Sequence, residues 1–250
     1  MNAVETRPHL ERRAQYEPHW DQEQFIVPLL RAAIELHLER HAKPLGPGGK
    51  ALDVGCGKQP FRAALEAFGF TYTGVDAQPG DGVAFVAPID GTLPDELFAE
   101  GPFQFLLCTE VLEHVADWHA AFENLARLTA PGGKLLLTCP HVYPLHEEPY
   151  DFWRPTPHAI RHYAEHAGFR VVSLEPIGTA WDVIGTTLGA CTISRGEWSW
   201  KARVAAWFVR RFVRTTYWLL RKGWLQTVPL GSKLYLSNVA VLEKDKAARG

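Results

Sequence analysis

The sequence predicts an α/β protein built on a doubly wound, mostly parallel sheet. The first observation behind this prediction is that short apolar segments of strand length alternate along the chain with segments of helical periodicity. The second is that glycines and acidic residues gather where the strands end, the edge at which such sheets bind ligands. With 250 residues, of which 46% are hydrophobic, the chain can bury a substantial core.

The composition bears on where in the cell the protein is located. Four cysteines lie far apart without C-x-x-C pairs, which indicates reduced thiols and predicts a cytoplasmic protein; they are Cys56, Cys108, Cys139 and Cys191. The polar N-terminus lacks the apolar core of an export signal. No uncharged apolar run reaches about 18 residues, so no transmembrane helix is expected.

Residues 1–48 are predicted to form a leader and a helix. Residues 1 to about 20 are polar and contain two prolines, which is typical of a loosely held segment. Apolar residues then recur at helical spacing from Phe25 to Leu38, before the breaker at 44–49. We expect this helix to pack on the core and to form one wall of a ligand pocket.

The stretch Ala51–Pro60 reads as a strand, a glycine turn and the start of a helix over 60–68. Gly55 and Gly57 permit a sharp turn and close approach of a ligand to the backbone. We expect a cradle with exposed N–H groups at a helix N-terminus. The phosphate-loop spacing is absent, and the dinucleotide fingerprint fits only in part because its third glycine would fall on Pro60.

The core is predicted to span residues 49–178. A helix is expected from Asp117 to Leu128, capped by the Asp117 side chain, and a turn at 131–133 precedes the fifth strand. A further helix is expected over 158–167. The six core strands are predicted at 51–53, 72–76, 83–86, 103–108, 134–139 and 169–174.

Residues 140–157 separate the fifth strand from the next helix. This segment is rich in proline and aromatic residues and also carries histidines and acids, so we expect a substrate loop or lid. His158, His162 and His166 repeat every four residues, which favours an exposed polar helix face.

Residues 179–230 form a predicted helical insertion, or cap, before a last strand at 233–242 within the segment 231–250. Four arginines of the insertion fall on one stripe of a helix, at positions 203, 210, 214 and 221, and apolar residues cover a broad face. For residues 198–224 three interpretations therefore stay open: contact with a membrane surface, packing as a substrate lid, and packing in a homodimer. The overall acidic balance argues against nucleic-acid binding.

Five segments in order resemble one family over residues 51–176: ALDVGCGKQPF, TGVDAQ, APIDGTLP, TEVLEHV and LTAPGGKLLLTCP. The chain resembles the class I S-adenosylmethionine-dependent methyltransferases, near the type 11 domain. The resemblance implies S-adenosylmethionine as cofactor, and a single domain with strand order 3-2-1-4-5-7-6 in which strand 7 is antiparallel.

The resemblance also assigns cofactor residues. Asp53, Gly55 and Gly57 would surround the methionine part. Asp76 would bind the ribose, with Ala77 and Gln78 beside the adenine. Near the adenine amino group would lie Asp90 and Gly91, and the floor would be Thr109 and Glu110. Gln59 departs from the family, which often has glycine there.

The position of Asp76 supports the ribose role independently. It lies about twenty residues after the glycine turn, at the end of the adjacent strand, where a carboxylate can accept both hydrogen bonds of a ribose diol. The alternative is that Asp76 and Asp90 are ordinary loop acids that cap turns.

Candidates for catalysis follow the fifth strand. His141 and His146 are the expected bases, and Asp151 would orient one of them or bind a substrate hydroxyl. His114 is expected near the methyl-transfer site, with a structural role as the alternative. His141, His146, Glu147, Glu148 and Asp151 could supply metal ligands, but their spacing matches no stereotyped site, so no metal is predicted.

The sequence thus predicts methylation of a hydroxyl on a small-molecule or glycan-like acceptor, with a lipid-linked acceptor as one form. Two alternatives stay open: C-methylation of a quinone-like lipid, and binding of S-adenosylmethionine without catalysis.

Overall fold

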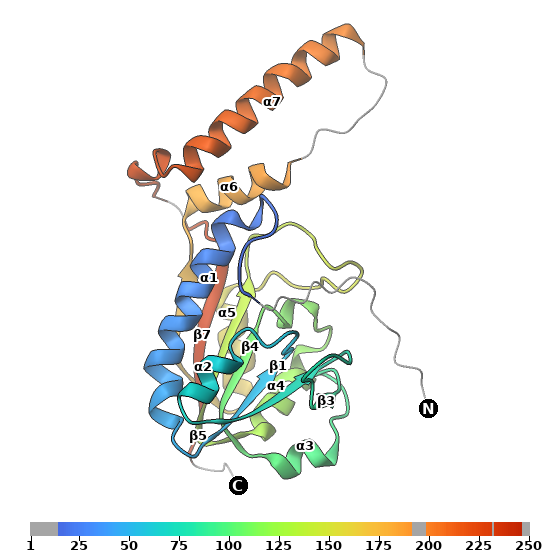
Figure 1. The fold of residues 1–250 in the computed structure, drawn as a ribbon, viewed down its shortest axis with the longest axis vertical. Helices are drawn as coiled ribbons and strands as arrows, with labels where there is room; N and C mark the ends of the chain where they lie inside the picture. Colours follow the sequence, from blue (N-terminus) through green and yellow to red (C-terminus); the bar gives the residue numbers. More distant parts are fainter. Residues whose placement is uncertain (1–14, 192–198, 232, 247–250) are drawn as a thin grey trace.

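The computed structural model describes residues 15–191, 199–231 and 233–246, and these residues pack around one seven-stranded sheet (Figure 1). The strand order is β3-β2-β1-β4-β5-β7-β6, and β7 runs antiparallel to β5 and β6. The predicted fold class and strand order are therefore confirmed. The strands are β1 (Lys50–Val54), β2 (Thr71–Asp76), β3 (Phe85–Val86), β4 (Phe103–Thr109), β5 (Thr129–Pro140), β6 (Phe169–Ile177) and β7 (Ser237–Lys244).

Alternate residues of the central strands enter two separate cores, because successive side chains of a strand point to opposite faces. In β4, Leu106 and Cys108 join one core while Phe105 and Leu107 join the other. The sheet is thus buried on both sides, which explains why its central strands are almost continuously apolar.

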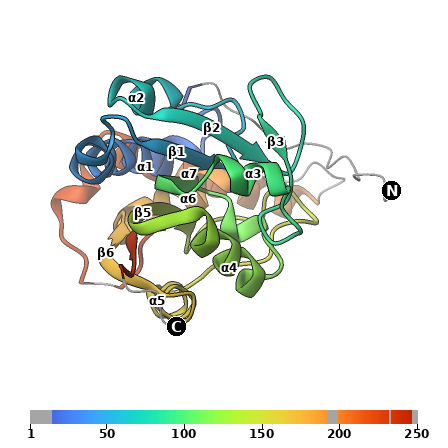
Figure 2. The same ribbon diagram turned by 90° about the horizontal axis from the view of Figure 1, so that it is seen from below.

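One core lies under α3 (Asp95–Glu100), α4 (Trp118–Leu128) and α5 (Pro157–His166). The other lies under α1 (Glu23–His37) and α2 (Arg62–Ala67), and α6 (Ala180–Ala190) packs against α1. Figure 2 shows the two helical layers on either side of the sheet. The Asp117 carboxylate accepts a hydrogen bond from the Ala120 N–H, which confirms the predicted cap of α4.

Several predicted boundaries differ from the structure. The strand predicted at 83–86 is reduced to the two residues of β3, and β7 begins four residues later than predicted. The turn predicted at 131–133 lies inside β5, since Phe103 pairs with Thr129 while Phe105 pairs with Lys134. The extra residues form a bulge, so the glycines bend the strand without ending it. Helix α3 was not predicted.

Helix α7 (Trp200–Arg221) extends away from the sheet (Figure 1). It is attached at its C-terminal end, where the Tyr217 hydroxyl donates to the Asp21 carbonyl and the Arg221 guanidinium donates to Gln24 Oε1. Leu220 is its buried residue. The sequence prediction of a helix in the insertion is correct, but α7 does not pack its apolar face onto the sheet.

Candidate functional site

The glycine turn after β1 is the start of the site, and its backbone is held by β2. The N–H groups of Gly55 and Cys56 both donate to the Val75 carbonyl, and that of Gly57 donates to Asp76 Oδ2. The expectation of exposed N–H groups is therefore wrong for these three residues. Helix α2 begins only at Arg62, so the turn is not a phosphate-binding helix start.

Gly55 is required where it stands. Its φ is +67°, and a Cβ built there would lie 2.3 Å from Val111 Cγ2. Gln59, where the family often has glycine, also has a positive φ of 57°. Its side chain donates to the Asp81 carbonyl and accepts from Arg62. The loop therefore keeps the glycine-like conformation, and side-chain hydrogen bonds stabilise it.

Two buried carboxylates mark the ends of β1 and β2. The Asp76 oxygens accept the N–H groups of Gly57 and Gln78, which fixes the orientation of this carboxylate. Asp53 accepts a hydrogen bond from the Tyr72 hydroxyl. Burial raises the pKa of Asp53 to about 7, the Tyr72 hydrogen bond opposes the shift, and the charge of Asp76 adds to it.

A cavity of about 450 Å³ lies over these strand ends. Its lining includes most of the predicted cofactor residues: Asp53, Gly55, Gly57, Asp76, Ala77, Asp90, Thr109 and Glu110. Gln78 and Gly91 lie outside the lining. Gln78 holds Asp76 through its N–H, and the Gly91 carbonyl accepts from the Asn124 amide.

The N-terminal segment closes one side of the cavity. Tyr16 and Trp20 line it, together with Ile26, Val27 and Leu30 of α1. The Tyr16 ring packs on Phe61 at 5.3 Å between centroids. The expected wall from the first helix is present. Residues 15–20 are not a loose leader as predicted, and residues 1–14 lie outside the described residues. Two aromatic residues in a polar segment were the signal for this wall.

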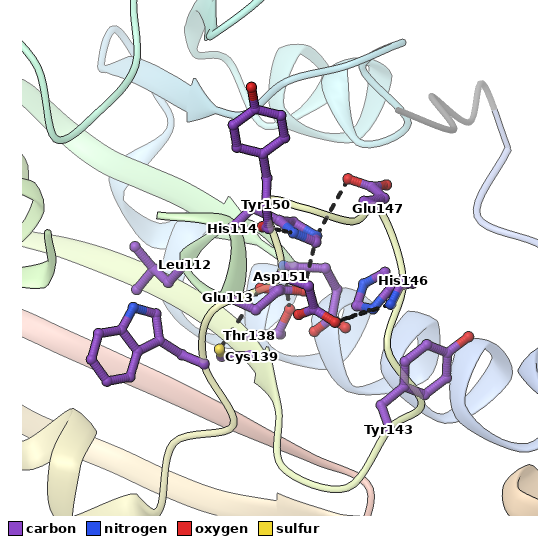
Figure 3. A network of polar contacts seen from close by, with 12 residues as sticks. Leu112, Glu113, His114, Thr138, Cys139, Tyr143, His146, Glu147, Tyr150 and Asp151 are labelled. Carbon is purple, nitrogen blue, oxygen red and sulfur yellow. Dashed lines mark hydrogen bonds and ion pairs between the residues drawn. The ribbon is translucent and has the colours of Figure 1, made fainter. Parts of the chain in front are cut away.

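Histidines also line the cavity. His114 lies on a 3₁₀ turn (Leu112–His114) after β4, and His146 and Glu147 come from the loop after β5. The His114 and His146 rings meet edge to face at 4.9 Å, and His114 Nε2 lies 3.4 Å from Glu147 Oε2 (Figure 3). Burial lowers the pKa of His114 to about 4 and also lowers the pKa of His146.

Asp151 and Arg154 fix the shape of this loop. The Arg154 guanidinium donates to both Asp151 oxygens, at 2.6 and 2.7 Å, and to the carbonyls of Tyr143 and Pro144. Asp151 Oδ2 also accepts the His146 N–H. Burial raises the pKa of Asp151. Hydrogen bonds from Arg154 and from the His146 N–H outweigh this effect and hold the pKa below its ordinary value. Asp151 thus lies beneath the cavity lining and orients His146.

His141 occupies a different place. Its ring stacks on Tyr235 at 4.4 Å, and its Nδ1 lies 3.0 Å from the Pro155 carbonyl. It is not among the residues that line the cavity. The exposed positions predicted for His158, His162 and His166 are observed.

Sequence reasoning missed Glu113, which lies beneath His114 with its side chain fully buried. Burial raises the pKa of Glu113 well above its usual range, and the nearby Glu110 adds to the shift. Glu110 and Glu147 both adopt a positive φ, of 53°, beside the cavity. Strained backbone of this kind is common at functional sites.

The family model of a methyltransferase domain matches residues 27–174, more than half of the chain. The chain belongs to the class I S-adenosylmethionine-dependent methyltransferases. This methyltransferase is also 34% identical over 102 residues to a ubiquinone biosynthesis O-methyltransferase of Xanthomonas oryzae pv. oryzae, a stretch that covers 36% of the chain and 43% of that relative. The chain spans less than half the length of the curated relatives it matches.

Solved structures agree with the methyltransferase fold. A sarcosine dimethylglycine methyltransferase from Galdieria sulphuraria superposes with a TM-score of 0.53 at 15% identity, over 87% of this chain and 86% of that one. The cyclase SpnF superposes with a TM-score of 0.53 at 15% identity, over 94% of this chain and all of that one. These likenesses show the fold alone.

S-adenosylmethionine is therefore the cofactor, and the cavity fits it. Gly55 and Gly57 line the cavity, so their backbone borders the space for a ligand. Asp76 presents a fixed carboxylate at the end of β2, suited to a diol. The lining near it is apolar, with Ala87, Ile89 and Val111, as a flat ring requires.

Proposed function

We propose that this methyltransferase methylates a hydroxyl oxygen of a small-molecule or glycan-like acceptor. The observation that supports the proposal is the position of His114, His146 and Glu147. They line the same cavity as the strand-end carboxylates Asp53 and Asp76. An acceptor bound between the two groups would meet polar side chains next to the cofactor, as base-assisted transfer requires.

The proposed roles follow from the contacts. Asp53 and Asp76 bind the cofactor, which supplies an electrophilic methyl group on its sulfonium. His146 receives the hydrogen bond of the acceptor hydroxyl and draws its proton away, and Asp151 positions the ring. His114 borders the same hydroxyl position. His141 as a base stays a prediction, and its stacking on Tyr235 indicates a supporting role for the loop.

The name of the ubiquinone biosynthesis O-methyltransferase supports transfer to oxygen. It also supports an aromatic or lipid-linked hydroxyl as acceptor. C-methylation of a quinone-like lipid, and binding of S-adenosylmethionine without methyl transfer, remain the alternatives. Methyl transfer to oxygen is favoured because polar groups face the acceptor side of the cavity.

We also propose that residues 198–224 contact a membrane surface; residue 198 lies outside the described residues. Aromatic side chains of α7 are exposed, among them Trp207, Phe208 and Phe212 at 62%, 62% and 67%. No acidic residue occurs between Trp200 and Arg221. Among the described residues, no helix has the length and apolar character to cross a membrane. None of the described residues of α6 and α7 lines the cavity.

The test of the function is methyl transfer from labelled S-adenosylmethionine to a panel of phenolic, sugar and lipid-linked hydroxyl compounds. We expect His146→Ala to lower kcat on the best acceptor about 100-fold or more, the usual contribution of a positioned base. Cofactor binding should change little. The matched control is His162→Ala, which removes an exposed imidazole on α5. Equal rates for the native chain and His146→Ala would contradict the proposal.

A further inference from the structure

Several hydrogen-bond acceptors face one another on the histidine side of the cavity. His114 Nδ1 lies 2.8 Å from the Tyr150 carbonyl, which can only accept, so this nitrogen carries the hydrogen. In the neutral ring, Nε2 therefore bears a lone pair. It points toward Glu147 Oε2 at 3.4 Å and toward Glu113 Oε1 at 3.9 Å (Figure 3).

His146 adds a second nitrogen of the same kind. Its Nδ1 lies 3.3 Å from the Pro144 carbonyl and from Asp151 Oδ2, and 3.4 Å from Arg154 Nη2. In the tautomer that carries its hydrogen on Nδ1, the two oxygens accept this hydrogen and Nε2 keeps a lone pair for a metal ion. Metal-binding histidines are held in this way, with the non-ligating nitrogen bonded to a carbonyl or a carboxylate.

Glu113 supplies the independent observation. Its side chain is fully buried, and Oε1 has no hydrogen-bond partner among the described residues. The other oxygen, Oε2, accepts from the Cys139 thiol. An acceptor left unpartnered in the interior is costly, and in this position it is aimed at His114 Nε2.

We propose that Glu113, His114 and His146 bind a divalent transition-metal ion, with Glu147 as a fourth ligand. One ligand atom from each of the first three lies within 4.8 Å of the other two. Metal–ligand bonds of about 2.1 Å bring neighbouring ligands to about 3 Å, so small side-chain rotations complete the site. Mixed imidazole and carboxylate ligands favour ions such as Mn²⁺, Fe²⁺ and Zn²⁺ over Mg²⁺.

This inference goes beyond methyl transfer and reverses the expectation that no metal binds. The ligands suggested by the sequence all lie in the loop after β5, whereas Glu113 and His114 come from the turn after β4. A consequence rests on the proposed function: an ion held here borders the acceptor side of the cavity, where it would lower the pKa of a coordinated hydroxyl. The two imidazoles would then act as ligands.

The test is a titration of the chelator-treated full chain with Mn²⁺, followed by the electron paramagnetic resonance signal of the free ion. We expect one bound Mn²⁺ per chain, displaced by Zn²⁺ and hardly by Mg²⁺. Glu113→Gln and His146→Ala should each weaken binding about 10-fold or more. His162→Ala, on the exposed face of α5, should bind as the native chain does.

Circular dichroism and S-adenosylmethionine binding are measured on the same samples. If Glu113→Gln fails to fold, His146→Ala and Glu147→Gln decide the outcome. The proposal is overturned if the native chain binds neither Mn²⁺ nor Zn²⁺, or if all folded variants bind Mn²⁺ as tightly as the native chain. Because no acceptor is needed, these results are independent of whether methyl transfer is observed.

Discussion

At the scale of single residues, the carboxylates of Asp53 and Asp76 receive different hydrogen bonds although both lie at the ends of neighbouring strands. Asp76 accepts two backbone N–H groups, whereas the hydrogen bond from Tyr72 does not offset the burial of Asp53. A cation brought close to Asp53 would favour its charged form. The methionine part of the cofactor, expected there, is cationic.

Binding of S-adenosylmethionine should therefore release a proton from Asp53. Its pKa in the unliganded protein is about 7, above the ordinary value of 3.8, and a cationic ligand lowers it. Affinity should fall as pH decreases below 7, by at most about 10-fold per pH unit. Calorimetry in buffers of different ionisation enthalpy counts the protons. Asp53→Asn should remove this proton release, and equal release by both proteins would contradict the role of Asp53.

The candidate site was predicted in part. The glycines and strand-end acids were found because they stand next to strands whose periodicity is clear. Glu113 was missed because a buried acid beside a histidine on a short turn looks like any capping residue in sequence. Tyr16 and Trp20 were missed because their contacts with the cavity depend on how the segment before α1 folds back.

At the scale of elements, α7 differs from the other described helices in how many of its large apolar side chains are exposed to solvent. Its large apolar residues at 200, 207, 208 and 212 are exposed, and its arginines at 203, 210 and 214 share a stripe with Arg221, which bonds to Gln24. An anionic bilayer would accommodate both the apolar residues and the arginines, since apolar rings enter the interface and guanidinium groups meet the headgroups.

The native chain should float with vesicles that contain phosphatidylglycerol and much less with pure phosphatidylcholine. Arg203→Gln, Arg210→Gln and Arg214→Gln combined should weaken binding about 100-fold, since each basic residue contributes about 1 kcal/mol. Trp207→Ser, Phe208→Ser and Phe212→Ser combined should abolish vesicle binding. Val172→Ser, an exposed apolar position on β6, serves as control. Flotation of both α7 variants like the native chain would exclude the membrane contact.

Helices and strands were predictable where the apolar residues follow one pattern over several positions, as in β4 and α4. The bulge in β5 was not, because Pro131, Gly132 and Gly133 are equally suited to a turn, and only the pairing with β4 decides between them. Helix α3 has six residues and one buried side chain, Leu97, too little for a helical pattern.

At the scale of the whole molecule, the cavity forms where three parts meet. The strand ends supply the carboxylates, the segment 15–30 supplies an aromatic and apolar wall, and the turn after β4 and the loop after β5 supply imidazoles and carboxylates. We propose that the first part binds S-adenosylmethionine. The turn after β4 and the loop after β5 place polar side chains where we propose that the acceptor binds. The proposal of methyl transfer to oxygen depends on these side chains.

The most direct measurement is carbon-13 magnetic resonance of the product formed with S-adenosylmethionine labelled at its methyl carbon. After turnover with the best acceptor of the panel, we expect the label in the region of methoxy carbons, in native samples and not in His146→Ala. A label in the region of methyl groups on carbon, or cofactor binding without a labelled product for any acceptor, would contradict hydroxyl methylation by this chain.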